Sequence, residues 1–590
     1  LINASLAESI LQMRENGFSY RDQVVLCRGN DKLSALAQDL ERLGIPVLFL
    51  GSLFERQEVK DLIALVSLLV DKRAMGLLRI SCSSEFEMPI EDVMHILEHL
   101  QLEENESEVW NLSLSTLSKK GMSALKNIKA ILNGFDSVSH PWEILATVLL
   151  DRTRIVADIA TSKSVSGQAQ GIAIWQFMNF ARQNFKGKGT PVMNMMARIR
   201  RLMKLNDDRD LRQLPTAAQS IDAVRLMTIH GSKGLEFPVV HLSGLNKDTI
   251  PGSYRRSKCP APEGMIFGGE GSSEDISREA HETEQECLFY VAMSRAQERI
   301  LFYAATTKGK TKVKRPLSSF LEKIGSTTII TIQPKLQLPS IPENIKLPVD
   351  FKGDISFTAN ALGLYKTCPR RFLYTHILCI GGRRQETAFM QMHEAVREVL
   401  QIIIESSSPS SIEWHHLLRD AFIKFGLNEH GYMTDYLSIA EMMLNFFIYS
   451  RNEANTQTGD KLTLNIAGTK IIVNIDEILI RDDKHTIRRV FTRHAPSDVQ
   501  KEIQHAIFYL AVKNAFPESY AELIYLADNT IYPLEFKEKD LNKYENQVEE
   551  LLHQIHQGDF KKPTSLHNCP NCPAFFICGA VPIGTIKKNF

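Results

Sequence analysis

Apolar and polar positions follow two alternating patterns over the first 72 residues. Apolar residues at helical spacing precede a short continuous apolar run, and the same order is then repeated. The predicted elements are a helix through Leu6, Ile10 and Met13, a strand at 24–27, a helix at 33–43 and a strand at 47–50. Helices that alternate with strands are typical of a parallel sheet, so this region supplies part of an α/β domain.

A long helical stretch interrupts this sheet. From about residue 75 to 215 the apolar positions keep helical spacing, and strand patterns return only at 224–228, 239–243 and 300–304. We therefore predict one sheet built from both ends of this region, with the helices as an insertion. The predicted domains are 1–74 and 216–325 for the sheet, 75–215 for the helical insertion, 326–354 for a proline-bearing linker and 355–590 for a second α/β domain.

The amino-acid composition is typical of a globular protein and does not by itself indicate a function. Apolar residues make up 44% and charged residues 23% of the chain, as in ordinary globular proteins, and no apolar run is long enough to cross a membrane. Because 69 basic residues balance 69 acidic ones, any nucleic-acid-binding surface must be local. The chain begins with Leu1 and shows no signal peptide, which indicates a truncated start and a cytoplasmic, nucleoid-associated protein.

A glycine-bearing loop lies between two of the predicted strands. The segment TIHGSKGLEF occupies residues 228–237, where glycine permits a tight turn and the close approach of a ligand. This segment resembles motif V of UvrD-like superfamily 1 DNA helicases, nearly residue for residue. The resemblance implies contacts to single-stranded DNA from Thr228, His230 and Lys233, and contacts to the nucleotide from Gly234 and Glu236.

Two further segments resemble motifs of the same family. ECLFYVAMSRA, residues 286–296, is an apolar helix that ends in Arg295. It resembles motif VI, whose arginine stabilises charge on the γ-phosphate during hydrolysis. VVLCRGN, residues 24–30, is a strand that ends in Arg28, and it resembles motif IV, which supplies a second phosphate-contacting arginine. Cys27 stands where the family usually has an aromatic residue, so a stacking contact to the adenine does not carry over.

Two other helicase features do not occur in the sequence. It has no GxxxxGK(S/T) phosphate loop and no strand that ends in two acidic residues to hold magnesium. The resemblance therefore implies the second RecA-like domain of an ATP-dependent 3′ to 5′ helicase, inactive alone, that binds ATP and Mg²⁺ together with a missing N-terminal RecA-like domain. Its expected partners are single-stranded and duplex DNA and a repair or recombination complex.

Nine cysteines are too few for a disulfide scaffold, but three of them crowd into CPNCPAFFIC, residues 569–578. With the distant Cys368 of YKTCPRRF, they provide the four ligands of a metal site in a reducing compartment. Four cysteines could bind either a zinc ion or an iron–sulfur cluster. The spacing resembles the 4Fe–4S staple of AddB-like and other RecB-family nucleases, which implies a cluster held by Cys368, Cys569, Cys572 and Cys578.

The resemblance to the RecB nuclease domain covers about 357–580, with His393, Asp476 and Gln504 at site positions. An active PD-(D/E)xK enzyme needs a second carboxylate and a nearby lysine. The corresponding strand, IRRVFTRH at 487–494, has neither, and Glu477 cannot replace them because adjacent strand residues point to opposite faces. We therefore expect a DNA-binding domain without nuclease activity. The alternatives are an active exonuclease with a helicase motor and a non-catalytic DNA-binding scaffold protein.

Overall fold

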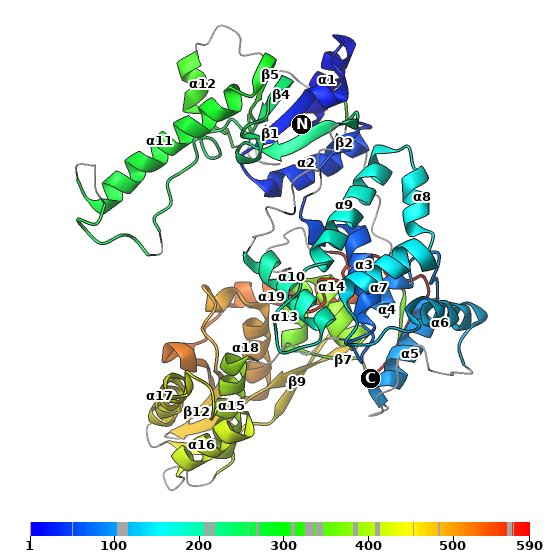
Figure 1. The fold of residues 1–590 in the computed structure, drawn as a ribbon. Coiled ribbons are helices and arrows are strands. Elements are labelled where there is room, and N and C mark those ends of the chain that lie inside the picture. Colours follow the sequence, from blue (N-terminus) through cyan, green and yellow to red (C-terminus); the bar gives the residue numbers. More distant parts are fainter. Residues whose placement is uncertain are drawn as a thin grey trace. The chain divides into compact units, whose positions relative to one another are not determined.

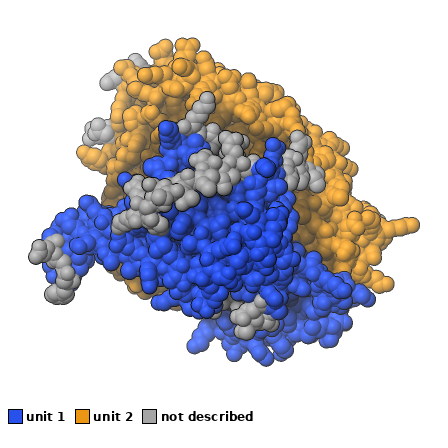
Figure 2. Space-filling model, turned by 90° about the horizontal axis from the view of Figure 1, so that it is seen from above, with its two compact units in different colours: residues 1–70, 130–343 blue, residues 71–129, 344–590 orange. Residues whose placement is uncertain are grey.

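The computed structural model of the 590-residue chain forms two compact units, coloured blue and orange in Figure 2. Unit 1 contains residues 1–70 and 130–343, and unit 2 contains residues 71–129 and 344–590. The structure describes residues 2–49, 51–102, 116–205, 211, 218, 220–257, 259–266, 271–307, 313–324, 335–337, 346–380, 387–406, 413–451, 454–481, 484–562, 569 and 572–590. Each unit has its own sheets, which confirms the prediction of two α/β parts.

Unit 1 is built on a five-stranded parallel sheet with the order β2-β3-β1-β4-β5. The strands are β1 (Gln23–Cys27), β2 (Val47–Leu48), β3 (Val224–Thr228), β4 (Phe237–Ser243) and β5 (Ala296–Tyr303). Strands from the beginning of the chain thus pair with strands that follow the helical insertion. This confirms that one sheet is built from both ends of that insertion.

Helices cover both faces of this sheet (Figure 1). Val25 of β1 packs with α1 (Ile2–Glu15) and α2 (Asn30–Arg42), whereas its neighbours Val24 and Leu26 pack with α11 (Ser273–Met293) and α12 (Ser319–Ile324). All five residues of β1 are buried. A strand covered on both faces needs a continuous apolar run, which explains the pattern seen at 24–27.

A buried polar network crosses the same sheet. His241 of β4 contacts the Tyr303 hydroxyl at 2.8 Å and the Gln23 side chain at 3.0 Å. Burial lowers the pKa of His241 to about 3, so the imidazole is neutral at physiological pH. The network therefore joins β1, β4 and β5 without burying a charge.

The helical insertion is divided between the two units. Its helices in unit 1 are α7 (Pro141–Thr147), α8 (Ile155–Thr161), α9 (Val165–Ala181) and α10 (Pro191–Leu205), which pack near α3 (Gln57–Ser67). Those in unit 2 are α4 (Leu77–Ile80) and α5 (Ile90–Leu102), and α6 (Lys119–Leu132) spans the boundary. The insertion is thus helical throughout its described residues, but its first part folds with the C-terminal domain. No described helix of the chain is long and apolar enough to cross a membrane.

Unit 2 contains two sheets of mixed direction, with the orders β7-β10-β9 and β14-β13-β12-β11-β8, and the parallel pair β15-β6. The strands are β6 (Val349–Lys352), β7 (Ser356–Thr358), β8 (Asn455–Thr458), β9 (Lys461–Ile466), β10 (Thr469–Asn474), β11 (Glu477–Arg481), β12 (Lys484–Phe491), β13 (Tyr520–Tyr525), β14 (Thr530–Pro533) and β15 (Ile586–Asn589). The helices are α13 (Ala359–Thr367), α14 (Pro369–Phe372), α15 (Ala388–Glu405), α16 (Trp414–Lys424), α17 (Met433–Arg451), α18 (Ile503–Ala515) and α19 (Glu538–His556). One of its cores lies among α15, α16 and α17.

The first part of the insertion is tied to the C-terminal tail within unit 2. The Ile90 amide donates to the Ile583 carbonyl at 3.1 Å, and the Thr585 amide donates to the Glu91 carboxylate at 2.7 Å. The last residues of the tail form β15, which pairs in parallel with β6. Residues 71–129 of the helicase-like part of the chain are therefore held by the last residues of the nuclease-like part.

Candidate nucleotide, DNA and cysteine sites

The loop at 228–237 begins at the carboxyl edge of the unit 1 sheet. Thr228 is paired with Cys27 in the register, and the Ile229 amide donates to the Cys27 carbonyl at 3.0 Å. The Thr228 hydroxyl accepts a hydrogen bond from the Gly231 amide at 3.0 Å, which fixes the turn. His230 and Lys233 are exposed beyond that turn. The three predicted DNA-contacting side chains thus lie on one short stretch that starts at this edge.

The same loop ends at the amino edge of the sheet, beside Arg295. Gly234 has a φ of 84°, a conformation that favours glycine, and the exposed Glu236 follows it. The Arg295 guanidinium donates to the Leu235 carbonyl at 2.8 Å, and the Phe237 amide donates to the Arg295 carbonyl at 2.9 Å. The structure therefore brings together Arg295 and Glu236, the residues predicted to contact the γ-phosphate and the ribose.

Arg28 does not join this pair. It follows the carboxyl end of β1, whereas Arg295 precedes the amino end of β5 in the same parallel sheet. The two arginines are separated by the length of a strand, roughly 20 Å at about 3.3 Å per residue. Arg28 instead donates to the carbonyls of Thr249 and Pro251 at 2.7 and 3.2 Å. Arg28 thus lies at the edge where Thr228 ends its strand, and its contact to a phosphate stays a prediction.

Two further basic residues, Lys32 and Arg315, lie near Arg28. Lys32 donates to the Thr249 hydroxyl at 3.1 Å, and burial, together with the nearby Arg315, lowers the pKa of Lys32. Arg315 forms an ion pair with Asp248 at 2.6 Å. The sequence position of Lys32, one helical turn into the segment that follows β1, could have indicated that it lies near Arg28. This edge of the sheet therefore carries more basic than acidic side chains.

The nuclease-like part contains Asp476, the central carboxylate of the predicted degenerate site. Its carboxylate accepts hydrogen bonds from the Arg489 guanidinium at 2.8 Å and from the Val490 amide at 2.7 Å. Burial raises the pKa of Asp476, although Arg489 and the Val490 amide act in the opposite direction. Each carboxylate oxygen thus has one protein donor, and the positive charge of Arg489 lies where an active enzyme holds a divalent cation.

The neighbouring Glu477 points away from Asp476. It is fully buried and binds Arg451 at 2.9 Å and Arg488 at 3.1 Å. The adjacent strand residues Arg488 and Arg489 thus bind the adjacent acids on opposite faces, as the strand geometry requires. This agrees with the expectation that Glu477 cannot act as a second metal ligand beside Asp476.

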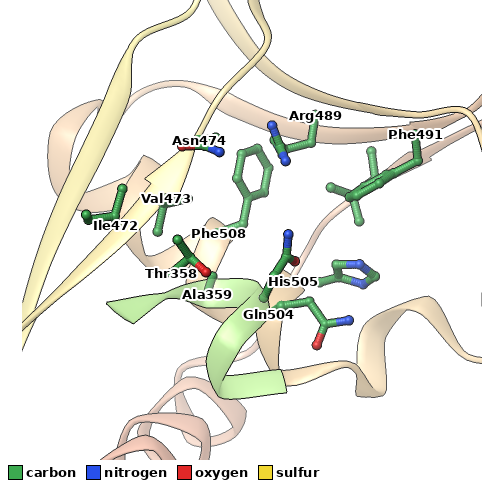
Figure 3. Close-up of a pocket in the computed structure, with 12 residues that line it drawn as sticks. Thr358, Ala359, Ile472, Val473, Asn474, Arg489, Phe491, Gln504, His505 and Phe508 are labelled. Atoms are coloured by element: carbon green, nitrogen blue, oxygen red, sulfur yellow. The ribbon is translucent and has the colours of Figure 1, made fainter. Parts of the chain in front are cut away.

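Arg489, the partner of Asp476, lines a small pocket (Figure 3). Arg489 of β12 and Asn474 of β10 approach it from two sheets, and Gln504 and Phe508 approach it from α18. Gln504 thus shares the pocket with Arg489 and, through it, lies near Asp476. His393 of α15 is buried with no hydrogen bond to its Nδ1 within the described residues, and it does not line this pocket. The structure therefore connects two of the three predicted site residues.

Three of the four predicted metal-binding cysteines lie near one another. Cys368 is the N-cap of α14, and its sulfur accepts a hydrogen bond from the Arg371 amide at 3.3 Å. Burial raises the pKa of Cys368 and of Cys572, the Cys578 thiol raises both further, and the Arg371 charge lowers both. Within the described residues, no three Cys, His, Asp or Glu side chains have the spacing to hold one metal ion.

Comparison with known proteins identifies both parts of the chain. Residues 2–307 match the family model of the UvrD-like helicase C-terminal domain, which is more than half of the chain, and residues 356–579 match the PD-(D/E)XK nuclease superfamily. The chain belongs to the UvrD-like helicase C-terminal domain family. The resemblances predicted from the motifs are thereby confirmed for the helicase part and for the nuclease fold.

The relatives that match this chain are named as helicases or as helicase/nuclease subunits. ATP-dependent DNA helicase PcrA of Bacillus subtilis (strain 168) is 23% identical over 335 residues, 53% of this chain and 41% of that protein. An ATP-dependent helicase/nuclease subunit of Lactobacillus johnsonii is 28% identical over 186 residues, 30% of this chain and 14% of that protein. The helicase/nuclease subunit of the same name from Thermoanaerobacter pseudethanolicus is 26% identical over 339 residues, 53% and 26% of the two chains. This UvrD-like chain thus spans less than half of these relatives' length.

Proposed function

We propose that this chain is the second RecA-like domain and the nuclease-like portion of an ATP-dependent DNA helicase or translocase. It moves 3′ to 5′ on DNA and acts in repair or recombination. ATP and Mg²⁺ bind where the amino edge of the unit 1 sheet meets a RecA-like domain that carries the phosphate loop. The nuclease-like domain binds DNA without cutting it and holds a 4Fe–4S cluster.

One observation carries this proposal. The ten-residue segment 228–237 has Thr228 and His230 at one edge of the sheet and Glu236 at the other, where Arg295 binds the Leu235 carbonyl. A displacement of Arg295 during hydrolysis therefore acts directly on the segment that also carries the DNA-contacting residues. Such a continuous connection between two sites is what a DNA-stimulated ATPase requires.

The DNA end of this segment is tested by Thr228→Val together with His230→Ala. We expect the double variant to bind single-stranded DNA about ten-fold or more weakly, because each lost base or phosphate contact costs about 1–3 kcal/mol. Fluorescence anisotropy with a labelled oligo(dT) at fixed salt measures the affinity. Thr228→Ser is the matched control, since its hydroxyl can still accept from the Gly231 amide. Equal affinity in the double variant and the wild type would remove both residues from the DNA site.

The inactive nuclease is supported by the occupation of Asp476. The Arg489 guanidinium and the Val490 amide hold both of its oxygens, and β12 supplies neither a second carboxylate nor a lysine. We expect no cleavage of linear or single-stranded DNA when Mg²⁺ or Mn²⁺ is added, measured by gel with a labelled substrate. Cleavage in the wild type that is lost in Asp476→Ala, with Asp528→Ala as an exposed control, would show that this site is catalytic.

The cluster proposal is supported by the surroundings of the cysteines. Four thiolates around one zinc ion must each approach it to about 2.3 Å, whereas each thiolate of a 4Fe–4S cluster binds a different iron. Cys368, Cys572 and Cys578 are close enough to influence one another's pKa. The resemblance of one distant cysteine plus Cys-x2-Cys-x5-Cys to the staple of RecB-family nucleases supports a 4Fe–4S cluster over zinc. Bound there, it would supply iron–thiolate bonds that link the two ends of the domain.

A further inference from the structure

Two arginines follow Cys368 and carry buried donors without acceptors. Arg370 and Arg371 follow Pro369, the first residue of α14. The Nε and Nη1 atoms of Arg370 and the Nε atom of Arg371 are buried, and none has a hydrogen-bond partner among the described residues. Burying a guanidinium N–H without an acceptor is unfavourable, so its persistence indicates that an acceptor belongs there.

The segment that carries the two arginines borders the cysteine site. The Arg371 amide donates to the Cys368 sulfur at 3.3 Å. The hydroxyl of the buried Tyr374, three residues further on, donates to the carbonyl of Ile577, the neighbour of Cys578, at 3.5 Å. Both arginines therefore lie between contacts to Cys368 and to the segment of Cys578.

We propose that Arg370 and Arg371 are the counter-charges of the cluster, with their buried N–H groups donating to its thiolate and sulfide atoms. This inference rests on the cluster proposed above. Four thiolates make the bound cluster anionic, and reduction makes it more negative. Nearby cations and hydrogen bonds to sulfur favour the reduced form, so these residues raise the reduction potential and strengthen retention of the cluster.

A simple structural role for the two arginines predicts something different. Arg488 of the same unit also has a buried Nε without a hydrogen bond, but the carboxylates of Glu477 and Glu522 lie 3.1 and 3.2 Å from its guanidinium. The three buried nitrogens of Arg370 and Arg371 have no hydrogen-bond partner among the described residues. An anionic group bound among the cysteines supplies several sulfur acceptors at once, which accounts for donors from both side chains.

The test measures the reduction potential of the cluster in the whole chain, purified anaerobically. Arg370→Gln and Arg371→Gln should each retain iron and shift the midpoint potential to a more negative value, and Arg371→Lys should recover most of the shift. Arg397→Gln is the matched control, because Arg397 is exposed and pairs only with Glu394 on α15 among the described residues. An unchanged potential in both glutamine variants with full iron content would overturn the inference.

Iron content provides the second measurement if a glutamine variant loses the cluster. Loss in Arg371→Gln with retention in Arg371→Lys supports the counter-charge role, whereas equal loss in both variants overturns it, because the charge would not be what matters. Wild-type chain that contains zinc and no iron contradicts the proposed cluster itself. The two failures are thereby distinguishable.

Discussion

Arg295→Ala is expected to abolish DNA-stimulated ATP hydrolysis in the helicase that contains both RecA-like domains, while leaving DNA binding largely intact. An arginine that stabilises charge on the transferring phosphoryl group contributes about 10³ to 10⁵-fold to turnover, because its interaction is strongest in the transition state. Arg295 lies beside Glu236, at the opposite edge of the sheet from Thr228. Its loss should therefore affect turnover far more than DNA affinity.

The measurement is steady-state ATP hydrolysis with saturating oligo(dT), together with DNA affinity in the same preparation. Arg278→Ala is the matched control, since Arg278 is an exposed arginine that pairs with Glu274 on α11, the helix that ends just before Arg295. Arg28→Ala adds a test of position, because Arg28 lies at the DNA edge and should change DNA binding. Wild-type turnover in Arg295→Ala, or selective loss of turnover in Arg28→Ala, would show that the nucleotide edge has been misplaced.

The sequence predicted the strands of the unit 1 sheet, but not the edge of the sheet at which each candidate residue lies. The apolar run at 24–27 and the segment 228–237 were sufficient to predict the parallel sheet and its glycine-bearing loop. The edge of the sheet that holds Arg28 depends on strand direction and pairing, which a local motif does not encode. Arg28 and Arg295 look alike in the sequence, but the register places them a strand's length apart.

Contacts between residues far apart in the chain could not be predicted from local sequence patterns either. Helical spacing correctly predicted helices after residue 75, but it carried no information on their partners. The contact of Glu91 with Thr585 joins residues almost 500 positions apart. Similarly, the missing carboxylate and lysine were visible in the strand 487–494, but the pairing of Arg489 with Asp476 required the sheet register. Hydrophobic periodicity defines elements, and only the packed structure defines their neighbours.

Cys572→Ser is expected to have the largest effect on stability, through loss of the cluster. A cluster bound by Cys368 and Cys572 closes a loop of about 200 residues, and closing such a loop is worth about 5 kcal/mol by the analogy with a disulfide. That is a large fraction of a domain's stability. The variant should contain little iron, where the wild type should contain about four irons per chain, and residues 355–590 should become sensitive to protease.

The contacts in unit 2 extend this prediction to the helicase-like part of the chain. Arg79 of α4 donates to the Cys578 carbonyl at 3.2 Å, and Glu91 of α5 holds the tail that follows Cys578. Disorder at Cys578 should therefore release residues 71–129 as well. The unit 1 sheet should stay folded, because its cores are formed by unit 1 residues. Hydrogen exchange measured by mass spectrometry resolves these three regions in one experiment.

Cys82→Ser is the matched control, because Cys82 is an exposed cysteine of the same unit outside the metal site. It should keep the iron content and the protease resistance of the wild type. If the wild-type chain contains one zinc ion, zinc takes the place of the cluster, and the cysteines still cross-link the two ends of the domain. Faster exchange in 355–590 without any change in 71–129 would contradict the coupling through Arg79 and Glu91. Unchanged metal content and unchanged proteolysis in Cys572→Ser would exclude a cross-link through Cys572, because the domain would then hold together without that thiol.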